Sequence, residues 1–333
     1  MRSSPRRSSS GRDTWSISYV EFRRKIWIPS RYRERCSLTE RKRVAVVGTP
    51  GGWSSEALAD AFERRFGERI LIDLDHVVLD VGEGTVRAGD WNLCELDGIW
   101  VKKAGRRYSS HLLDRLEILR FAAESGVPVF SHPEKILRLL DRLSCTVTLG
   151  AHGIPLPPTR VTEDMGHALD AVRDFGEAVL KPLYSTKARG MELVRWTNEA
   201  ETRAEIESFR DAGNPVMYIQ KKIDIPLQDH GLVFLRGEFI GGYARVRGTG
   251  AWNTTIHSGG KYAPYDPSAE IVELARAAQA PFGLDFTSVD IAETEQGPIV
   301  FEVLAFGGFR GLTEGAGVDV LEVVTGHVEE WIR

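Results

Sequence analysis

Long hydrophobic runs and cysteines are both scarce in this sequence, and their scarcity excludes several classes of protein. No apolar stretch approaches the roughly 18 residues that a membrane-spanning helix requires. We therefore expect no membrane partner and a cytoplasmic location. The three cysteines, Cys36, Cys94 and Cys145, are far apart and odd in number. This usage predicts reduced thiols rather than a disulfide framework or a zinc site.

Motifs of several common enzyme classes are also missing. The glycine-rich turn at Gly48, Gly51 and Gly52 lacks the Lys-Ser/Thr pair of a P-loop, and its spacing differs from the dinucleotide fingerprint. We interpret it mainly as a turn that reverses the chain. Ligand contact is less favoured, and a dinucleotide-binding oxidoreductase is the weakest hypothesis. No Ser-His-Asp or Cys-His arrangement suggests a catalytic nucleophile, so His230 and His257 are expected to have positional or surface roles.

Basic residues are concentrated at the start of the chain. Residues 1–43 carry 13 Lys/Arg and four Asp/Glu, whereas the remaining 290 residues carry 30 basic and 43 acidic side chains. An acidic body argues against a nucleic-acid partner. The Ser/Arg-rich residues 1–42 lack a core pattern and predict a disordered segment. A basic tail or a misplaced start codon is favoured over a transit-type presequence.

Strand and helix patterns alternate through residues 43–135. The apolar run RVAVV predicts a buried strand, and the stretch after the glycine-rich turn predicts an amphipathic helix capped near Ser54 or Ser55. The continued alternation predicts an open, mainly parallel α/β sheet. Lys102 and Lys103 follow one strand end, where such sheets place ligands, and a solvated basic loop is an equal alternative.

The middle of the chain places a lysine at the end of an apolar strand. Residues 178–183 read AVLKPL, and burial of Lys181 is costly unless an anion neutralises it. The next residues, 184–191, offer hydroxyls, cations and small side chains, which suit a flap over a polyphosphate. A plain surface turn is the alternative.

Residues 289–303 predict a hairpin. With its turn centred on Gln296, Asp290 lies opposite Glu302, and Val289 and Ile291 lie opposite Val303 and Phe301. Two carboxylates facing each other on paired strands are unfavourable unless a cation separates them. A hard divalent ion with oxygen ligands suits this pair, and two solvated acids are the alternative.

Five segments in order resemble the ATP-grasp ligases: LDRLSCTVTLGAHGIPLPPT, LKPLYSTKARGM, YIQKKI, GLDFTSVDI and FEVLAFGG. The resemblance spans residues 43–330. It is nearest to the RimK-like carboxylate–amine ligases that add glutamate, and within them to the bacterial GAK-system ATP-grasp enzymes. It implies an α/β and α+β fold. An N-terminal pre-ATP-grasp lobe (43–135) is followed by a central lobe (136–215) and a C-terminal lobe (216–333), and the last two clasp the nucleotide.

The resemblance also implies a role for particular residues. Lys181, Arg245 and Arg247 are the expected catalytic cations, and Asp290 and Glu302 match two magnesium ligands, with manganese as an alternative ion. Thr255 and Arg310 are expected to contact substrate. The residues implied in ATP binding are Arg142, Lys181, Ser185, Thr186, Arg189, Gln220, Lys221, Lys222, Ile223, Asp229 and Asn253.

The chain departs from the family pattern near the expected metal site. Leu304 stands where a third ligand, an asparagine, is expected, and Gly231 stands where an arginine is expected. The leading hypothesis is an ATP- and Mg²⁺-dependent ligase that activates a carboxylate as an acyl-phosphate for attack by an amine. The alternative is a nucleotide-binding regulatory protein with weak or no turnover. The sequence leaves the acid, the amine and the oligomeric state open.

Overall fold

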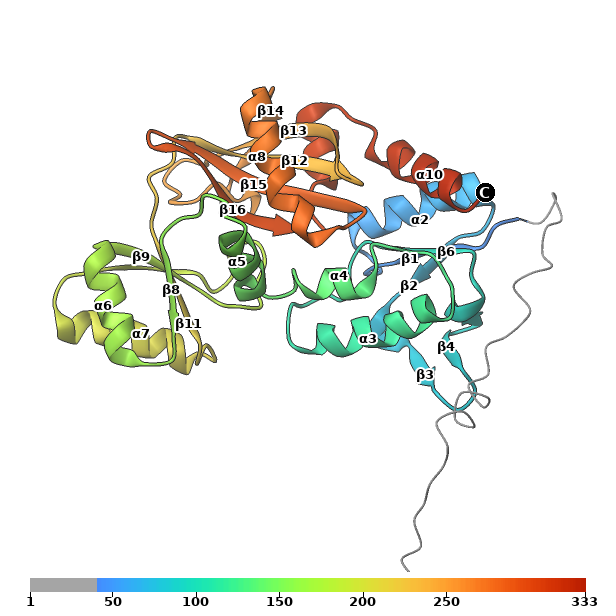
Figure 1. The fold of residues 1–333 in the computed structure, drawn as a ribbon, viewed down its shortest axis with the longest axis horizontal. Coiled ribbons are helices and arrows are strands. Elements are labelled where there is room, and N and C mark those ends of the chain that lie inside the picture. Colours follow the sequence, from blue (N-terminus) through green and yellow to red (C-terminus); the bar gives the residue numbers. More distant parts are fainter. Residues whose placement is uncertain (1–40) are drawn as a thin grey trace, which may run out of the picture. The chain divides into compact units, whose positions relative to one another are not determined.

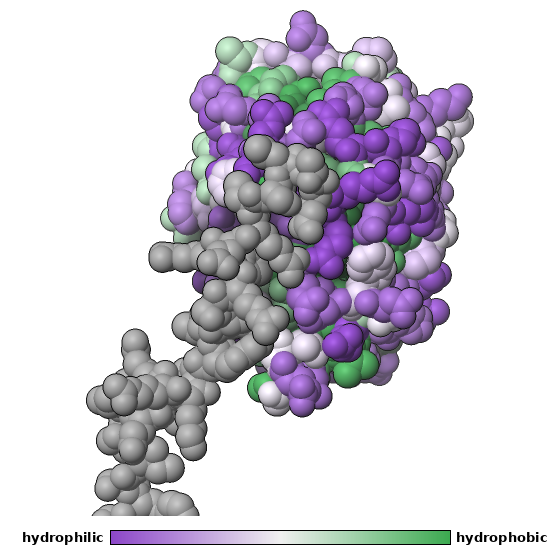
Figure 2. Space-filling model, turned by 90° about the vertical axis from the view of Figure 1, so that its right-hand side faces the viewer, coloured by the Kyte–Doolittle hydropathy of each residue, from purple (hydrophilic) through white to green (hydrophobic). Residues whose placement is uncertain are grey.

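The computed structural model describes residues 41–333 (Figure 1). The segment predicted to be disordered lies, apart from its last two residues, outside this range. No helix within residues 41–333 is long and apolar enough to span a membrane. In the view of Figure 2, hydrophilic residues predominate over the visible part of the described surface, and hydrophobic residues lie between them in small groups.

The first sheet of the described chain is parallel throughout. Its order is β2 (Ile70–Ile72), β1 (Val44–Val47), β6 (Gly98–Val101) and β7 (Val129–Phe130). All four residues of β1 are buried, as expected of a strand covered on both faces. Helices α2 (Trp53–Phe66), α3 (His111–Glu124) and α4 (Pro133–Leu137) accompany this sheet. The chain passes from β1 outward to β2 and later returns to the other side of β1.

The predicted cap of the first helix is wrong. Helix α2 begins at Trp53 with Gly52 as its N-cap, and no side chain caps it. The hydroxyl of Ser55 instead accepts a hydrogen bond from the backbone N–H of Thr49 at 3.0 Å. Ser55 is therefore used to hold the glycine-rich turn against the helix.

Two further sheets, one of three and one of four strands, have only antiparallel neighbours. The small sheet contains β3 (Val78–Asp80), β4 (Thr85–Ala88) and β5 (Trp91–Asn92). The next sheet has the order β10 (Glu192–Arg195), β9 (Glu177–Lys181), β11 (Met217–Lys221) and β8 (Thr159–Thr162), with antiparallel neighbours. Helices α6 (Met165–Phe175) and α7 (Glu199–Asp211) bury apolar residues such as Val172 and Phe209 with this sheet. Lys181 is the last residue of β9, as predicted.

The last sheet is antiparallel and holds the predicted hairpin. Its order is β14 (Lys261–Pro264), β13 (Glu238–Val246), β12 (Gln228–Leu235), β15 (Phe286–Thr294) and β16 (Gly297–Leu304). The helices that follow or pack near it are α5 (Arg142–Ala151), α8 (Ala269–Gln279), α9 (Phe309–Gly311) and α10 (Val320–Trp331). Helix α5 joins it through Cys145, whose sulfur accepts from the N–H of Val303 at 3.5 Å.

The hairpin register differs from the prediction on one side of the carboxylates. Asp290 lies opposite Glu302 and Val289 opposite Val303, as expected. The register then shifts, so that Ile291 lies opposite Val300 rather than Phe301. This bulge sends Val300 into the buried core and leaves Phe301 outside it. An extra residue in one strand changes the direction of a side chain in this way, and here that residue is Phe301, next to Glu302.

The buried ring of Tyr243 on β13 explains one departure from the family pattern. A Cβ added at Gly231 would lie 2.4 Å from this ring, and one added at Gly311 would lie 2.3 Å from it. Tyr243 is only 3% exposed. The ring therefore fills the space that a side chain at position 231 would need.

We predict that Gly311→Ala lowers the free energy of unfolding by about 1–3 kcal/mol, because a methyl group would overpack the Tyr243 ring. Gly311 has a φ of −62°, so backbone strain does not contribute. Gly150→Ala is the matched control, since Gly150 lies in α5 with nothing within 4 Å of an added Cβ. It should stabilise the protein by about 0.5–1 kcal/mol. Urea unfolding of both variants measures the difference, and equal effects would contradict the packing argument.

Candidate nucleotide and metal site

Lys181 is enclosed by polar and aromatic groups rather than by acids. Its ammonium donates to Gln220 Oε1 at 2.5 Å and lies 5.6 Å from the centre of the Phe301 ring. Burial, reinforced by the charge of Arg142 and opposed by that of Glu302, lowers the pKa of Lys181 to about 7. A desolvated ammonium without a direct carboxylate partner is a receptor for an anion.

Gln220 is held so that its carbonyl faces Lys181. Its amide donates to the hydroxyls of Thr159 at 3.0 Å and Tyr218 at 3.2 Å. The Tyr218 hydroxyl in turn lies 2.8 Å from that of Thr146 on α5. These two strands and one helix fix the position of the lysine. Sequence reasoning did not single out Tyr218 and Thr146, although both lie in segments that carry the ATP-grasp resemblance, because their contact joins residues 72 positions apart.

Arg142 ties helix α5 to the end of β16. Its guanidinium is largely buried and pairs with Glu302 Oε2 at 2.8 Å. Asp141 caps the helix by accepting from the N–H of Ser144 at 2.7 Å. The N–H of Arg142 donates to the carbonyl of Leu183 at 3.0 Å, next to the flap loop, residues 184–191. Arg142 therefore connects that loop with one expected metal ligand.

Asp290 forms a buried charge network with its neighbours on β12 and β13. Arg245 binds both oxygens of Asp229, at 3.0 and 2.7 Å, and donates to Asp290 Oδ2 at 3.0 Å. Burial raises the pKa of Asp290, and Arg245 opposes this effect while Glu302 and Asp229 reinforce it. Asp229 uses both of its oxygens here, so its expected contact with ribose would compete with Arg245.

The residues present fit a divalent cation. Asp290 lies opposite Glu302, and Asp290 Oδ1 is buried without a hydrogen-bond partner. A buried carboxylate oxygen without a donor is costly, and a hard cation removes that cost. Within residues 41–333 no group of three or more His, Cys, Asp or Glu could hold a metal, and Leu304 offers no oxygen. Two carboxylates would therefore share the ion with non-protein oxygens.

The flap loop is held by its own backbone and hydroxyls. Ser185 donates to the carbonyl of Arg189 at 2.6 Å, and the N–H of Arg189 donates to the carbonyl of Thr186 at 3.3 Å. Lys187 adopts a φ of 60° and Ala188 a φ of 57°, a backbone region that is unfavourable for residues other than glycine. The loop therefore presents Lys187 and Arg189 from a strained turn.

The expected adenine strand offers backbone groups at its end. The N–H of Lys221 donates to Pro158 O at 2.8 Å, and that of Lys222 donates to Glu177 O at 2.9 Å. The Lys222 side chain pairs with Glu177 at 3.0 Å and with Asp224 at 2.8 Å. Ile223 is the second residue after the strand, with no such contact from its N–H in the described chain.

The remaining predicted residues lie in other contacts. Asn253 Oδ1 accepts from the N–H of Thr255 at 3.1 Å and from its hydroxyl at 2.8 Å. Arg247 lines a pocket of about 480 Å³ with Leu227 and residues 248–252. Arg310 pairs with Glu314 at 2.5 Å and lies 5.9 Å from the Trp53 ring centre. The structure thus unites Lys181, Arg142, Arg245, Asp229, Asp290, Glu302 and Gln220, but it gives Asn253, Thr255, Arg247 and Arg310 no direct contact with them.

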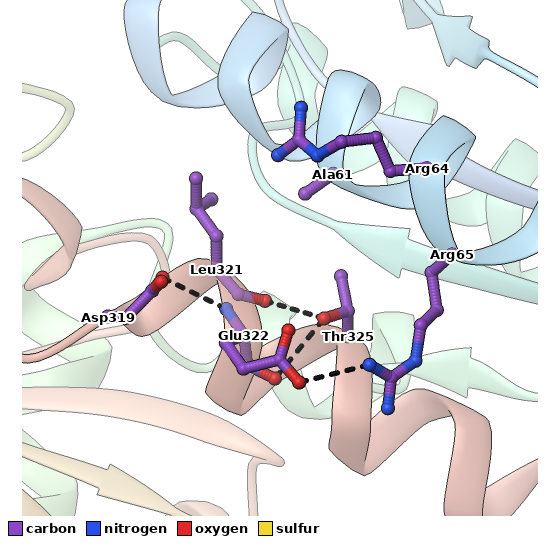
Figure 3. Close-up of a pocket in the computed structure, with 7 residues that line it drawn as sticks. All are labelled: Ala61, Arg64, Arg65, Asp319, Leu321, Glu322 and Thr325. Carbon is purple, nitrogen blue, oxygen red and sulfur yellow. Dashed lines mark hydrogen bonds and ion pairs between the residues drawn. The ribbon is translucent and has the colours of Figure 1, made fainter.

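A second pocket lies between α2 and α10. It has a volume of about 310 Å³, and Arg65 reaches across it to Glu322 at 3.0 Å (Figure 3). The other lining residues are Ala61, Arg64, Asp319, Leu321 and Thr325. None of the residues predicted for the nucleotide site lines it, so we do not assign it to the reaction.

Comparison with known proteins gives a consistent family. Residues 140–326 match the RimK-like ATP-grasp domain. The chain is 24% identical to a tetrahydromethanopterin:alpha-L-glutamate ligase of Methanosarcina acetivorans, over 86% of this chain and 99% of that protein.

Solved structures share the fold. A RimK domain ATP-grasp protein from Sphaerobacter thermophilus aligns with a TM-score of 0.67 and 24% identity, over 85% of this chain and 98% of that one. The ATP-grasp ligase PsnB, solved with a variant of its minimal precursor, Mg and ADP, aligns with a TM-score of 0.68 and 16% identity, over 89% of this chain and 100% of that one. The ATP-grasp fold is therefore confirmed, while the narrower likeness to GAK-system enzymes and the predicted lobe boundaries stay predictions. The chain belongs to the RimK-like ATP-grasp family of ATP-dependent ligases.

Proposed function

We propose that this chain uses ATP to join a carboxylate to an amine, with Lys181 and Arg142 holding the phosphates and Asp290 and Glu302 holding Mg²⁺. The observation that carries this assignment is the position of the Lys181 ammonium, which has no ion pair of its own within residues 41–333, beside the Arg142–Glu302 pair at the expected metal site. Lys181 lies 5.6 Å from the Phe301 ring centre, next in sequence to Glu302. A polyphosphate with a divalent cation suits this arrangement, because the phosphates would pair with Lys181 and the cation with the carboxylates.

The reaction proposed for the site has two steps. An oxygen of the acid substrate attacks the γ-phosphorus of ATP, the bond to the β-phosphate oxygen breaks, and ADP leaves. The amine nitrogen then attacks the carbonyl carbon of the acyl-phosphate, phosphate leaves and the amine loses a proton. No side-chain nucleophile is required, because positioning and charge neutralisation carry the catalysis.

The chain's own residues supply most of the charge neutralisation in this scheme. Lys181 and Arg142 would face the phosphates, and Arg245 would keep Asp229 and Asp290 in place beneath them. A bound Mg²⁺ would offset phosphate charge and polarise the transferred phosphoryl group. Mn²⁺ has similar preferences for carboxylate oxygens and is proposed as a substitute ion.

The substrates proposed are a small-molecule or peptide acid and an amine of the glutamate type. The relative from Methanosarcina acetivorans is named for adding L-glutamate to tetrahydromethanopterin, and PsnB was solved with a peptide precursor. We place the reaction in the cytoplasm, where ATP and Mg²⁺ are available.

We expect purified protein to form ADP from ATP and Mg²⁺ over many turnovers only when pools of carboxylic acids and amines are both supplied, because an acid alone supports only the first step. Lys181→Met and Asp290→Asn should each reduce this activity by about 10²–10³-fold, because each removes a charge that stabilises the transition state. Chromatographic measurement of ADP checks the result. Lys261→Met and Glu295→Gln are the controls, since both residues are exposed and Glu295 lies in the turn of the same hairpin. Nucleotide binding without ADP in any pool would support the regulatory alternative.

Nucleotide binding should take up a proton near pH 8. With a pKa of about 7, Lys181 in the empty site is about 90% neutral at that pH. A phosphate beside it restores the ordinary, higher pKa, so the bound lysine is charged. The contribution of Lys181 to nucleotide affinity should therefore be fully present below about pH 7 and should decrease as the pH rises above that value.

Calorimetry of Mg²⁺ and a non-hydrolysable ATP analogue measures this uptake, through buffers with different ionisation enthalpies. About one proton should enter with the nucleotide at pH 8. Lys181→Met should remove most of the uptake, while Lys261→Met should leave it unchanged. An uptake that persists in Lys181→Met would show that another group titrates on binding.

A further inference from the structure

The carboxyl edge of the parallel sheet carries positive charge that the proposed ATP site does not use. The sheet order β2-β1-β6-β7 means that the chain leaves β1 toward β2 on one side and places β6 and β7 on the other. The strand order therefore reverses between β1 and β6. In open α/β sheets, ligands bind outside the carboxyl ends of the strands at such a switch point.

Lys102 and Lys103 lie at this switch point. They follow directly after β6, and both of their N–H groups donate to the carbonyl of Val47, the last residue of β1, at 2.8 and 3.1 Å. The glycine-rich turn leaves β1 at the same place, and its Thr49 hydroxyl is buried without a hydrogen-bond partner. Two cations and a free hydroxyl therefore gather where two neighbouring strands end.

The switch point adjoins the reaction centre. Lys102 is 3% exposed; its ammonium donates to the carbonyl of Phe306 at 2.6 Å and lies 4.3 Å from the Phe309 ring centre. Phe306 follows β16, the strand that carries Glu302. Burial raises the pKa of Tyr108, a few residues after Lys103, and the charge of Glu302 reinforces that shift. The loop after β6 is therefore close enough to Glu302 to feel its charge.

Cations of the flap loop face the same region. Burial lowers the pKa of Lys103, and the positive charges of Lys187 and Arg189 lower it further. None of the ion pairs found in residues 41–333 involves Lys102, Lys103, Lys187 or Arg189. By contrast, Arg106 in the same loop pairs with Asp73 at 3.8 Å, and Arg115 pairs with Asp75 at 2.5 Å. Like charges gathered without acids are unfavourable unless an anion joins them.

We infer that this switch point binds a carboxylate of the acid substrate other than the one that is activated. Lys103 pairs with that carboxylate, Lys102 reinforces the positive potential from behind, and Lys187 lies over it on the flap loop. The inference rests on the proposed function and adds a class of substrate to it, an acid with at least two carboxylates. The ATP phosphates have Lys181, Arg142 and the flap loop, so Lys102 and Lys103 are available to a second anion.

The test compares diacids with matched monoacids in the presence of Mg²⁺ and a non-hydrolysable ATP analogue. The probes are glutarate against butyrate, neither of which carries an amine, and calorimetry measures their dissociation constants. Wild-type protein should bind the diacids more tightly. Lys103→Met should weaken diacid binding by about 10-fold to 100-fold, because one charged contact is lost, and should leave nucleotide affinity within about twofold. Lys103→Arg should retain most of the preference.

Arg107→Met is the matched control, because Arg107 is an exposed cation of the same loop with no ion pair in the described chain. It should leave the diacid preference intact. Wild-type protein that does not distinguish diacids from monoacids would overturn the inference, and so would equal effects of Lys103→Met and Arg107→Met. Loss of nucleotide affinity in Lys103→Met would instead assign these cations to the ATP phosphates. The assay needs no turnover, so failure of the ligase proposal, seen as absent ADP formation, is a separate result.

Discussion

The pairing of Asp290 with Glu302 on neighbouring strands is the constraint on which the site depends. Two opposed carboxylates, one of them 5% exposed, destabilise a sheet unless positive charge is supplied. The chain supplies it from two directions, through Arg245 at 3.0 Å from Asp290 and Arg142 at 2.8 Å from Glu302. Each arginine also has a second connection, to Asp229 and to the backbone of Leu183. The contacts of these two arginines thus hold β12, β13, α5 and the residue before the flap loop close to β15 and β16.

The departures from the family pattern make sense in these terms. Gly231 cannot carry a side chain because the Tyr243 ring lies 2.4 Å from where its Cβ would be. A guanidinium nevertheless lies near Gly231, since Arg245 on β13 is directly opposite Asp229 on β12. Positive charge is therefore present beside Asp290 although the expected position lacks it. Leu304 has no comparable replacement, because no third acid or histidine of residues 41–333 joins the pair.

Periodicity and spacing were enough to predict the parallel sheet, the strand-end lysine and the facing carboxylates. These features depend on local alternation and on residues close together in sequence. The bulge that moves Phe301 out of the core was not predictable, because the hairpin pattern fits either register until the strand packs against α5. The Arg142–Glu302 pair joins residues 160 positions apart, and no local pattern specifies such a contact. The predicted helix cap was wrong for a different, local reason, since the Ser55 hydroxyl accepts from the N–H of Thr49 six residues earlier.

Two lysines whose pKa values are lowered by desolvation, Lys102 and Lys181, have different roles in the site. Desolvation lowers the pKa of both Lys102 and Lys181 to about 7. Lys181 ends β9 beside Gln220 and the Glu302 strand, where a polyphosphate would restore its charge. Lys102 follows directly after β6, and its ammonium donates to the carbonyl of Phe306, which connects the parallel sheet to the loop after the expected metal ligands. An anion bound at either lysine keeps its ammonium charged, and a ligand that binds only the folded protein stabilises it against unfolding.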